Sequence, residues 1–111
     1  MKLLVFILNK EEHLEEVLEA FLELNIGGAT ILDSVGMGSI LARDIPIFAG
    51  FRHLLQGSRT ANKTIFTIVS EDLVKPAVQA IEQIVGPLED TGNGLVFILD
   101  VDQVFGVTKT F

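Results

Sequence analysis

Apolar residues fill four short segments of the chain, in runs of strand length. Residues 2–8 ("KLLVFIL") form a continuous apolar run suited to the centre of a sheet, and residues 63–69 ("KTIFTIV") and 95–101 ("LVFILDV") are similar. Residues 29–35 ("ATILDSV") mix apolar and polar positions. We therefore predict four strands over these ranges.

The segment after the first strand carries apolar residues at helical spacing. Glutamates occupy most of the other positions, so one face of the helix would be buried and the other solvated. Asn9 offers a helix cap, with Glu12 as its capping-box partner, and Gly27 and Gly28 are expected to end the helix. The apolar stripe consists of Leu14, Val17, Leu18, Phe21 and Leu22.

A second helix is predicted after the third strand. Ser70 can cap it, and two acidic residues follow near its positive end. Pro76 is disruptive beyond the first helical turn, which favours a regular helix that begins just before it. Gly86 and Pro87 would end this helix. Its apolar stripe consists of Leu73, Val74, Ala77, Val78, Ile81, Ile84 and Val85.

The order of these elements is β-α-β-β-α-β, which predicts an α+β fold of the ferredoxin-like type. In this βαββαβ sandwich both helices cover one face of an antiparallel sheet. Strands that are apolar on both sides need a partner for the other face. We therefore expect a homo-oligomer with its sheets turned inward.

The long segment between the second and third strands, residues 39–61, is apolar and cationic. It holds all three arginines of the chain, Arg43, Arg52 and Arg59, and one acidic residue, Asp44. Its net charge is therefore +2. Since the whole chain carries −7, the remainder carries −9. Its apolar residues fit a short amphipathic helix between Asp44 as a cap and Gly57 as an end, so a partly helical loop is predicted.

Composition excludes several classes of function. The 111 residues contain no cysteine, which excludes disulfides and thiolate chemistry and fits a reducing compartment such as the cytoplasm. The net charge of −7 argues against nucleic-acid binding, which depends on phosphate neutralisation. No apolar run approaches the roughly 18–20 residues of a membrane span. The first residues fit a strand better than a signal peptide, because acidic residues follow the short apolar run.

Two segments resemble a known family. "NIGGATILDSVGMG" and "GNGLVFILDVDQV" are similar to segments of the PII nitrogen-regulatory signalling proteins. In that family a Gly-x-Gly after the second strand begins a long mobile loop, the T-loop, and a second Gly-x-Gly precedes the last strand. Thr30, Gly36 and Gly38 match the first segment, and Gly92 and Gly94 match the second.

The resemblance implies a non-enzymatic, homotrimeric sensor with a single PII-like domain over residues 1–111, in which 39–61 is the T-loop-like insertion. Members bind adenine nucleotides, as effectors and not as cofactors, in clefts between subunits. They respond by moving the T-loop onto ammonium channels, enzymes or transcription regulators. Backbone N–H groups of paired glycines can approach phosphate oxygens closely, because no Cβ intervenes.

The chain departs from the family pattern at several positions. The family's second motif reads Gly-Asp-Gly-Lys, with the lysine on the phosphates, whereas Leu95 stands at the lysine position here. Gly106 and Thr108 stand where the family has two phosphate-binding arginines, with Lys109 nearby. The chain also has no tyrosine to be modified. Arg43, Arg52, Arg59 and Lys109 are therefore the candidate phosphate contacts.

Three interpretations of residues 39–61 stay open. In the first, the segment packs on its own trimer and covers the apolar sheet. In the second, its apolar side docks a protein or a membrane surface, and its arginines contact anionic groups there. In the third, its arginines close over an anionic ligand. The candidate partner-binding residues are Ile47, Phe48, Phe51, His53 and Leu54.

No other pattern indicates chemistry. His13 and His53 lie on separate elements and make a weak metal site, so none is predicted, although the related CutA proteins, trimeric and linked with metal tolerance, keep that alternative open. The serines have no histidine–acid partner at readable spacing, so no catalytic triad is indicated. The alternative to a nucleotide sensor is a trimeric interaction or scaffold protein that has lost the ligand.

Overall fold

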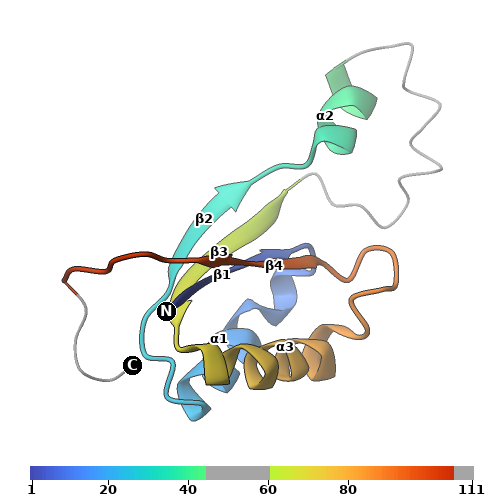
Figure 1. Cartoon of the computed structure of the whole chain (residues 1–111). Helices are drawn as coiled ribbons and strands as arrows, with labels where there is room; N and C mark the ends of the chain where they lie inside the picture. The colour runs from blue at the N-terminus through green and yellow to red at the C-terminus, as the bar shows by residue number, and fades with distance from the viewer. Residues whose placement is uncertain (45–60, 107–111) are drawn as a thin grey trace.

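The computed structural model describes residues 1–44 and 61–106, with the backbone alone for residues 42–44. The elements follow the predicted order, with one additional helix after the second strand (Figure 1). They are β1 (Lys2–Leu8), a 3-10 turn η1 (Glu11–His13), α1 (Leu14–Glu23), β2 (Thr30–Ser34), α2 (Met37–Asp44), β3 (Asn62–Val69), α3 (Glu71–Val85) and β4 (Leu95–Asp100).

The four strands form one sheet in the order β2-β3-β1-β4. Every neighbouring pair is antiparallel. Helices α1 and α3 both lie on one face of this sheet, side by side, and β2 and β4 are its two edges (Figure 1). This arrangement confirms the predicted α+β, ferredoxin-like fold.

The core lies between the sheet and the two helices. In β1, Leu4, Phe6 and Leu8 alternate toward the helices and are fully buried. Alternation places every second side chain of a strand on the same face. Val17 and Phe21 of α1 pack into the same core, as do Ile65, Val69, Ala77, Ile81 and Val85 from β3 and α3. Most residues of the predicted apolar stripes therefore face the sheet, but Leu22 is 66% exposed, so its place in the buried stripe was wrong.

The ends of α1 differ from the prediction. Lys10 and not Asn9 precedes the opening turn, and no side chain caps it by a hydrogen bond, so the expected capping role of Asn9 was wrong. The helix ends at Glu23, and Asn25, two residues further on, has a left-handed φ of 66°. The N–H of Ile26 donates to the carbonyl of Phe21 at 2.8 Å, and that of Asn25 to the carbonyl of Leu22 at 3.0 Å. This is a Schellman motif, so Gly27 and Gly28 do not end the helix.

Pro76 lies inside α3, which begins five residues earlier at Glu71. The expectation that the regular helix begins just before Pro76 was therefore wrong. Because proline has no N–H, the carbonyl of Asp72 lacks its usual helical donor. Gly86 ends the helix with a φ of 96°, as predicted, and its N–H donates to the carbonyl of Glu82 at 3.0 Å.

Helix α2 lies where the sequence predicted the beginning of the loop. The N–H of Ile40 donates to the carbonyl of Gly36 at 3.2 Å, so the helix starts directly after β2. Asp44, which the sequence offered as a cap, is the last described residue of this helix. The rest of the helix predicted between Asp44 and Gly57 lies outside the described residues. Within the described ranges, no helix is long and apolar enough to cross a membrane.

Candidate functional site

The sheet face opposite the helices carries three apolar rows that run across the strands. One row consists of Leu95, Ile7 and Leu32, with Thr64 of β3 between Ile7 and Leu32; the hydroxyl of Thr64 takes part in the polar row described below. The next two rows hold Phe97, Val5, Phe66 and Thr30, and then Leu99, Leu3 and Ile68. Leu95, Phe97 and Leu99 of the edge strand are 57%, 43% and 46% exposed. We call this surface the open face, because neither α1 nor α3 covers it.

A polar row follows the apolar rows at one end of the open face. Ser34 pairs with Asn62, and its hydroxyl donates a hydrogen bond to the Asn62 side-chain oxygen. The Ser34 Oγ also lies 2.7 Å from the Thr64 Oγ1. Because the Ser34 hydrogen is donated to Asn62, the Thr64 hydroxyl is the donor in this second hydrogen bond. Asn62 in turn donates through Nδ2 to Oδ1 of Asn9 at 3.3 Å. Asn62 and Thr64 are buried, so we call Asn9, Ser34, Asn62 and Thr64 the polar row.

Both Gly-x-Gly segments flank this end of the sheet. Gly36 and Gly38 follow the carboxyl end of β2, and Gly92 and Gly94 precede β4. Because β2 and β4 are opposite edges, three strand spacings of about 4.8 Å separate them, or about 14 Å. The polar row fills the space between the two segments. The structure thus brings four of the predicted residues to one end of one sheet.

The loop that carries Gly92 and Gly94 is fixed by its own packing. A Cβ on Gly94 would come within 2.8 Å of the Ile7 carbonyl oxygen and of the Phe6 ring, and its φ is 123°. Gly92 has a φ of 89°. Asn93 is buried and donates through Nδ2 to the carbonyl of Pro87 at 2.7 Å. These glycines are therefore required by the fold itself.

Gly36 differs from Gly94. A Cβ at Gly36 would meet nothing within 4 Å, and its φ lies outside the left-handed region. The chain's own fold therefore does not require glycine at this position. Open space beside an unneeded glycine is compatible with a ligand that approaches the backbone.

Thr30 lies at the opposite end of β2 from Gly36 and is exposed. Four residues of strand separate Thr30 from Ser34, which corresponds to about 13 Å. Thr30 therefore cannot join the polar row of its own chain. It could reach a site at that row only from a neighbouring copy.

The charges at this end of the sheet are already paired. Lys63 forms an ion pair with Asp33 of β2 and lies 4.0 Å from a carboxylate oxygen of Glu11. The hydrogen bond to Asp33 raises the pKa of Lys63, and burial opposes the shift only partly. Lys10 donates to the carbonyl of Val85 at 3.0 Å, at the C-terminal end of α3. Additional positive charge for an anion would have to come from elsewhere.

The predicted cationic residues are only partly located. The backbone of Arg43 lies in α2, close to Gly36 and Gly38 in the chain. The other candidates for ligand or partner contacts lie outside the described residues: Arg52, Arg59, Lys109, Ile47, Phe48, Phe51, His53 and Leu54.

Sequence reasoning missed the polar row. Its signal was the run "ANKT" at the start of β3, where two side chains that alternate onto one face, Asn62 and Thr64, are both polar. Asn9 directly follows the apolar strand β1, and Ser34 is the last residue of β2. Only strand pairing shows that these residues are neighbours.

The described residues contain no group of three or more histidine, aspartate or glutamate side chains placed to hold a metal ion. His13 lies 2.9 Å from a carboxylate oxygen of Glu16, one turn further along the chain. This contact is a local one at the beginning of α1.

Comparison with protein-family models matches residues 1–110 to the family described as nitrogen regulatory protein P-II. The chain belongs to this family. No curated protein matches the chain. Membership confirms the resemblance carried by the two glycine-containing segments, and the P-II match includes residues 39–61. It supports a regulatory signalling protein as the class of function.

Proposed function

We propose that this P-II family protein is a non-enzymatic regulator that assembles as a homotrimer through its open face. It binds an adenine nucleotide or a related anionic small molecule at the polar row. Residues 39–61 then transmit occupancy of the site to a partner protein.

The observation that carries this proposal is the composition of the open face. Three largely apolar rows end in the polar row, in which Asn62 and Thr64 are buried, and a Gly-x-Gly segment lies at either side of it. Apolar surface of this kind gains free energy when a second copy covers it. Assembly would therefore enclose the polar row in a cleft between subunits.

Each part of the site has a distinct role in this proposal. The backbone around Gly36 and Gly38 approaches the anionic group of the ligand, since no Cβ obstructs it at Gly36. Ser34 and Asn62 provide hydrogen bonds, and a neighbouring copy contributes Thr30. Positive charge comes from arginines of the 39–61 segment, whose net charge is +2.

A second function is favoured by Leu95. This residue is 57% exposed on the open face beside the site, at the position of the family's phosphate-binding lysine. Leucine cannot contact a phosphate by a charge-assisted hydrogen bond. A trimer without a nucleotide, which docks a protein or a membrane through residues 39–61, is therefore the alternative.

The first experiment is a thermal-shift screen against ATP, ADP, AMP, cyclic dinucleotides and 2-oxoglutarate. A ligand that binds only the folded state raises the melting temperature by mass action. We expect a shift of several degrees with at least one nucleotide. The absence of any shift would favour the alternative, and phospholipid vesicles would be tested next.

Gly36→Val locates the site. The new side chain enters space that the fold leaves open, so the unliganded melting temperature should change little, whereas nucleotide affinity should fall at least tenfold. Gln79→Val, on an exposed position of α3, is the control and should retain affinity. Gly94→Val is unsuitable, because its Cβ collides with β1. Unchanged affinity in Gly36→Val would place the ligand elsewhere.

A further inference from the structure

The end of the sheet that holds the polar row carries an excess of negative charge. Strand pairing and the turns beside it bring four segments there, residues 8–13, 33–36, 62–64 and 86–95, and we call them the site end. The cationic residues of the site end are Lys10 and Lys63. Its acidic residues are Glu11, Glu12, Asp33, Glu89 and Asp90. Two positive and five negative charges give the site end a net charge of −3.

The two lysines of the site end already have partners. Lys63 forms an ion pair with Asp33, and Lys10 donates to the carbonyl of Val85 at 3.0 Å. The segment 39–61, with its net charge of +2, brings the balance to −1. Since the whole chain carries −7, the rest of it carries −6, so a neighbouring copy supplies no excess of positive charge. Each phosphate of a ligand therefore enters a region without net positive charge to balance it.

The floor beside the polar row is apolar. Leu95 pairs with Ile7, and Ile7 pairs with Thr64 of the polar row, so these residues form one cross-strand row on the open face. Leu95 is 57% exposed and directly follows Gly94, which the fold requires. A leucine side chain offers packing surface for a flat ring but no donor for a phosphate oxygen. The site end thus suits a ligand with an apolar ring and little charge.

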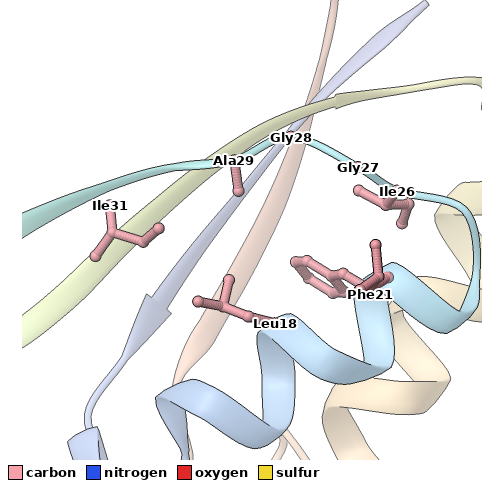
Figure 2. Close-up of a pocket in the computed structure, with 8 residues that line it drawn as sticks. Leu18, Phe21, Ile26, Gly27, Gly28, Ala29 and Ile31 are labelled. Carbon is pink, nitrogen blue, oxygen red and sulfur yellow. The ribbon is translucent and has the colours of Figure 1, made fainter. Parts of the chain in front are cut away.

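An apolar groove at the other end of the sheet does not supply an alternative site for phosphates. Its volume is about 260 Å³, and Figure 2 shows Leu18 and Phe21 of α1 facing Ala29 and Ile31 around the beginning of β2. All of its lining residues are apolar or glycine. A phosphate that left water for this surface would lose hydrogen bonds without gaining charged partners. The site end is therefore the better place for a phosphate group.

We infer that the proposed site accepts a nucleotide with a single phosphate group and discriminates against diphosphates and triphosphates. One phosphate can receive hydrogen bonds from backbone N–H groups around Gly36, where no Cβ intervenes. Every further phosphate adds negative charge to an end of the sheet that is already acidic. This inference rests on the proposed function, because it specifies which nucleotide the proposed site prefers.

Isothermal titration calorimetry with AMP, ADP and ATP tests the inference. Magnesium is left out, so that the charge of the ligand increases with each phosphate, and the ionic strength is about 0.15 M. We expect AMP to bind about tenfold or more tightly than ATP, with ADP between them. An ATP affinity equal to or above that of AMP would overturn the inference and leave the proposed function standing. Binding of none of the three would overturn the proposed adenine-nucleotide site, and the inference with it.

Removal of two acidic charges from the site end should weaken the discrimination. Glu89→Gln with Asp90→Asn changes the charge at exposed positions shortly before Gly92, with little change of shape. The ratio of AMP affinity to ATP affinity should fall by about threefold or more, because less negative charge opposes the additional phosphates. An unchanged ratio would remove the electrostatic basis of the inference and overturn it.

The matched control is Glu19→Gln with Glu23→Gln, which makes the same change of charge on exposed positions of α1. Along the helix axis these residues lie about 9 and 15 Å from His13 at the site end. Both distances exceed the Debye length of about 8 Å at this ionic strength, so the affinity ratio should not change. An equal fall of the ratio in both double variants would assign the discrimination to the overall net charge, and would overturn its origin at the site end.

Leu95→Lys adds a positive charge to the floor of the site. ATP affinity should rise by about tenfold or more, and AMP affinity should rise less, because the ammonium group can contact the additional phosphates. Leu95→Met keeps the apolar surface and should retain the natural ratio. Sedimentation velocity checks that both variants assemble as the natural chain does. An assembled Leu95→Lys chain that binds AMP but gains no affinity for ATP would overturn the inference.

Discussion

The two faces of the sheet are built from similar residues but have different surroundings. Phe6 and Phe97 lie one pairing position apart on neighbouring strands. Phe6 faces α1 and α3 and is completely buried, whereas Phe97 faces away from them and is 43% exposed. The helix-covered face stabilises the single chain. The open face is left partly exposed in the single chain, and it is the surface that the proposed assembly would cover.

This difference teaches that hydrophobic content alone does not identify a core. The strands β1 and β4 are apolar on both sides, so their sequence contains surface for two interfaces. The helices supply apolar side chains for only one of them. A substitution on the helix-covered face should therefore lower the stability of the chain at any protein concentration. The same substitution on the open face should have an effect that depends on protein concentration.

The largest expected effect is that of Phe6→Ala. A large buried side chain lost from a packed core costs about 3–5 kcal/mol of unfolding free energy. Phe97→Ala should change the unfolding free energy of the dissociated chain by less than about 1 kcal/mol but shift assembly to higher concentration. Urea denaturation at several protein concentrations, with sedimentation velocity, measures both. If Phe6→Ala and Phe97→Ala lowered the unfolding free energy equally, and neither loss depended on protein concentration, the open face would not be an interface.

Glycines provide a second, smaller contrast. Gly94→Ala puts a Cβ against the Ile7 carbonyl and the Phe6 ring at a φ of 123°, which should cost roughly 2–4 kcal/mol. Gly36→Ala enters open space and should be neutral or stabilise by about 0.4–1 kcal/mol through the unfolded state. Thermal and urea unfolding distinguish them. A marked loss of stability in Gly36→Ala would mean that glycine is needed there by the fold.

The polar row should give an intermediate effect. Asn62→Ala removes the acceptor of Ser34 and the donor to Asn9, which should cost about 1–3 kcal/mol because buried polar groups lose partners. Ser34→Ala, which removes one hydroxyl, should cost less. If the proposed site is correct, both variants also lower nucleotide affinity, measured by calorimetry. Asn62→Ala with full affinity would limit the row to a structural role.

The smallest effect concerns the exposed ion pair between Lys2 and Asp100 at the opposite end of the sheet. The hydrogen bond from Lys2, and then its charge, lower the pKa of Asp100, and the same hydrogen bond raises the pKa of Lys2. The contribution of the pair is thus present above the unfolded pKa of aspartate, near 3.9, and lost as pH falls below it. It is also lost as pH rises above the unfolded pKa of lysine, near 10.4.

Melting temperatures of the natural chain and of Lys2→Met should therefore differ most between about pH 5 and 9 and converge at both extremes. The difference should be small, because surface pairs contribute little. Asp100→Asn provides the second single variant of a double-mutant cycle. A difference that stays constant down to pH 2.5 would assign the effect to packing of the Lys2 side chain and not to its charge.

Local sequence determined most of the elements of this protein. Runs such as residues 2–8 predicted all four strands to within about one residue, and stripes such as Val17 and Phe21 predicted helices α1 and α3, because burial imposes their periodicity directly. The two Gly-x-Gly segments carried the resemblance to the P-II family, which the match over residues 1–110 confirms. Local errors occurred at element ends. Asn25 and not Gly27 provides the left-handed residue that follows the end of α1, since asparagine tolerates a left-handed φ.

Only the tertiary structure decided which residues meet. Asn9, Ser34 and Asn62 lie far apart in the chain and become neighbours because β2, β3 and β1 pair in a particular register. Whether the fold requires glycine, as at Gly94, or does not, as at Gly36, likewise depends on the atoms that lie beside each backbone. No sequence pattern shows these atoms. The sequence by itself specified the elements, through local periodicity, whereas strand pairing specified the polar row and the open face, through contacts between distant residues.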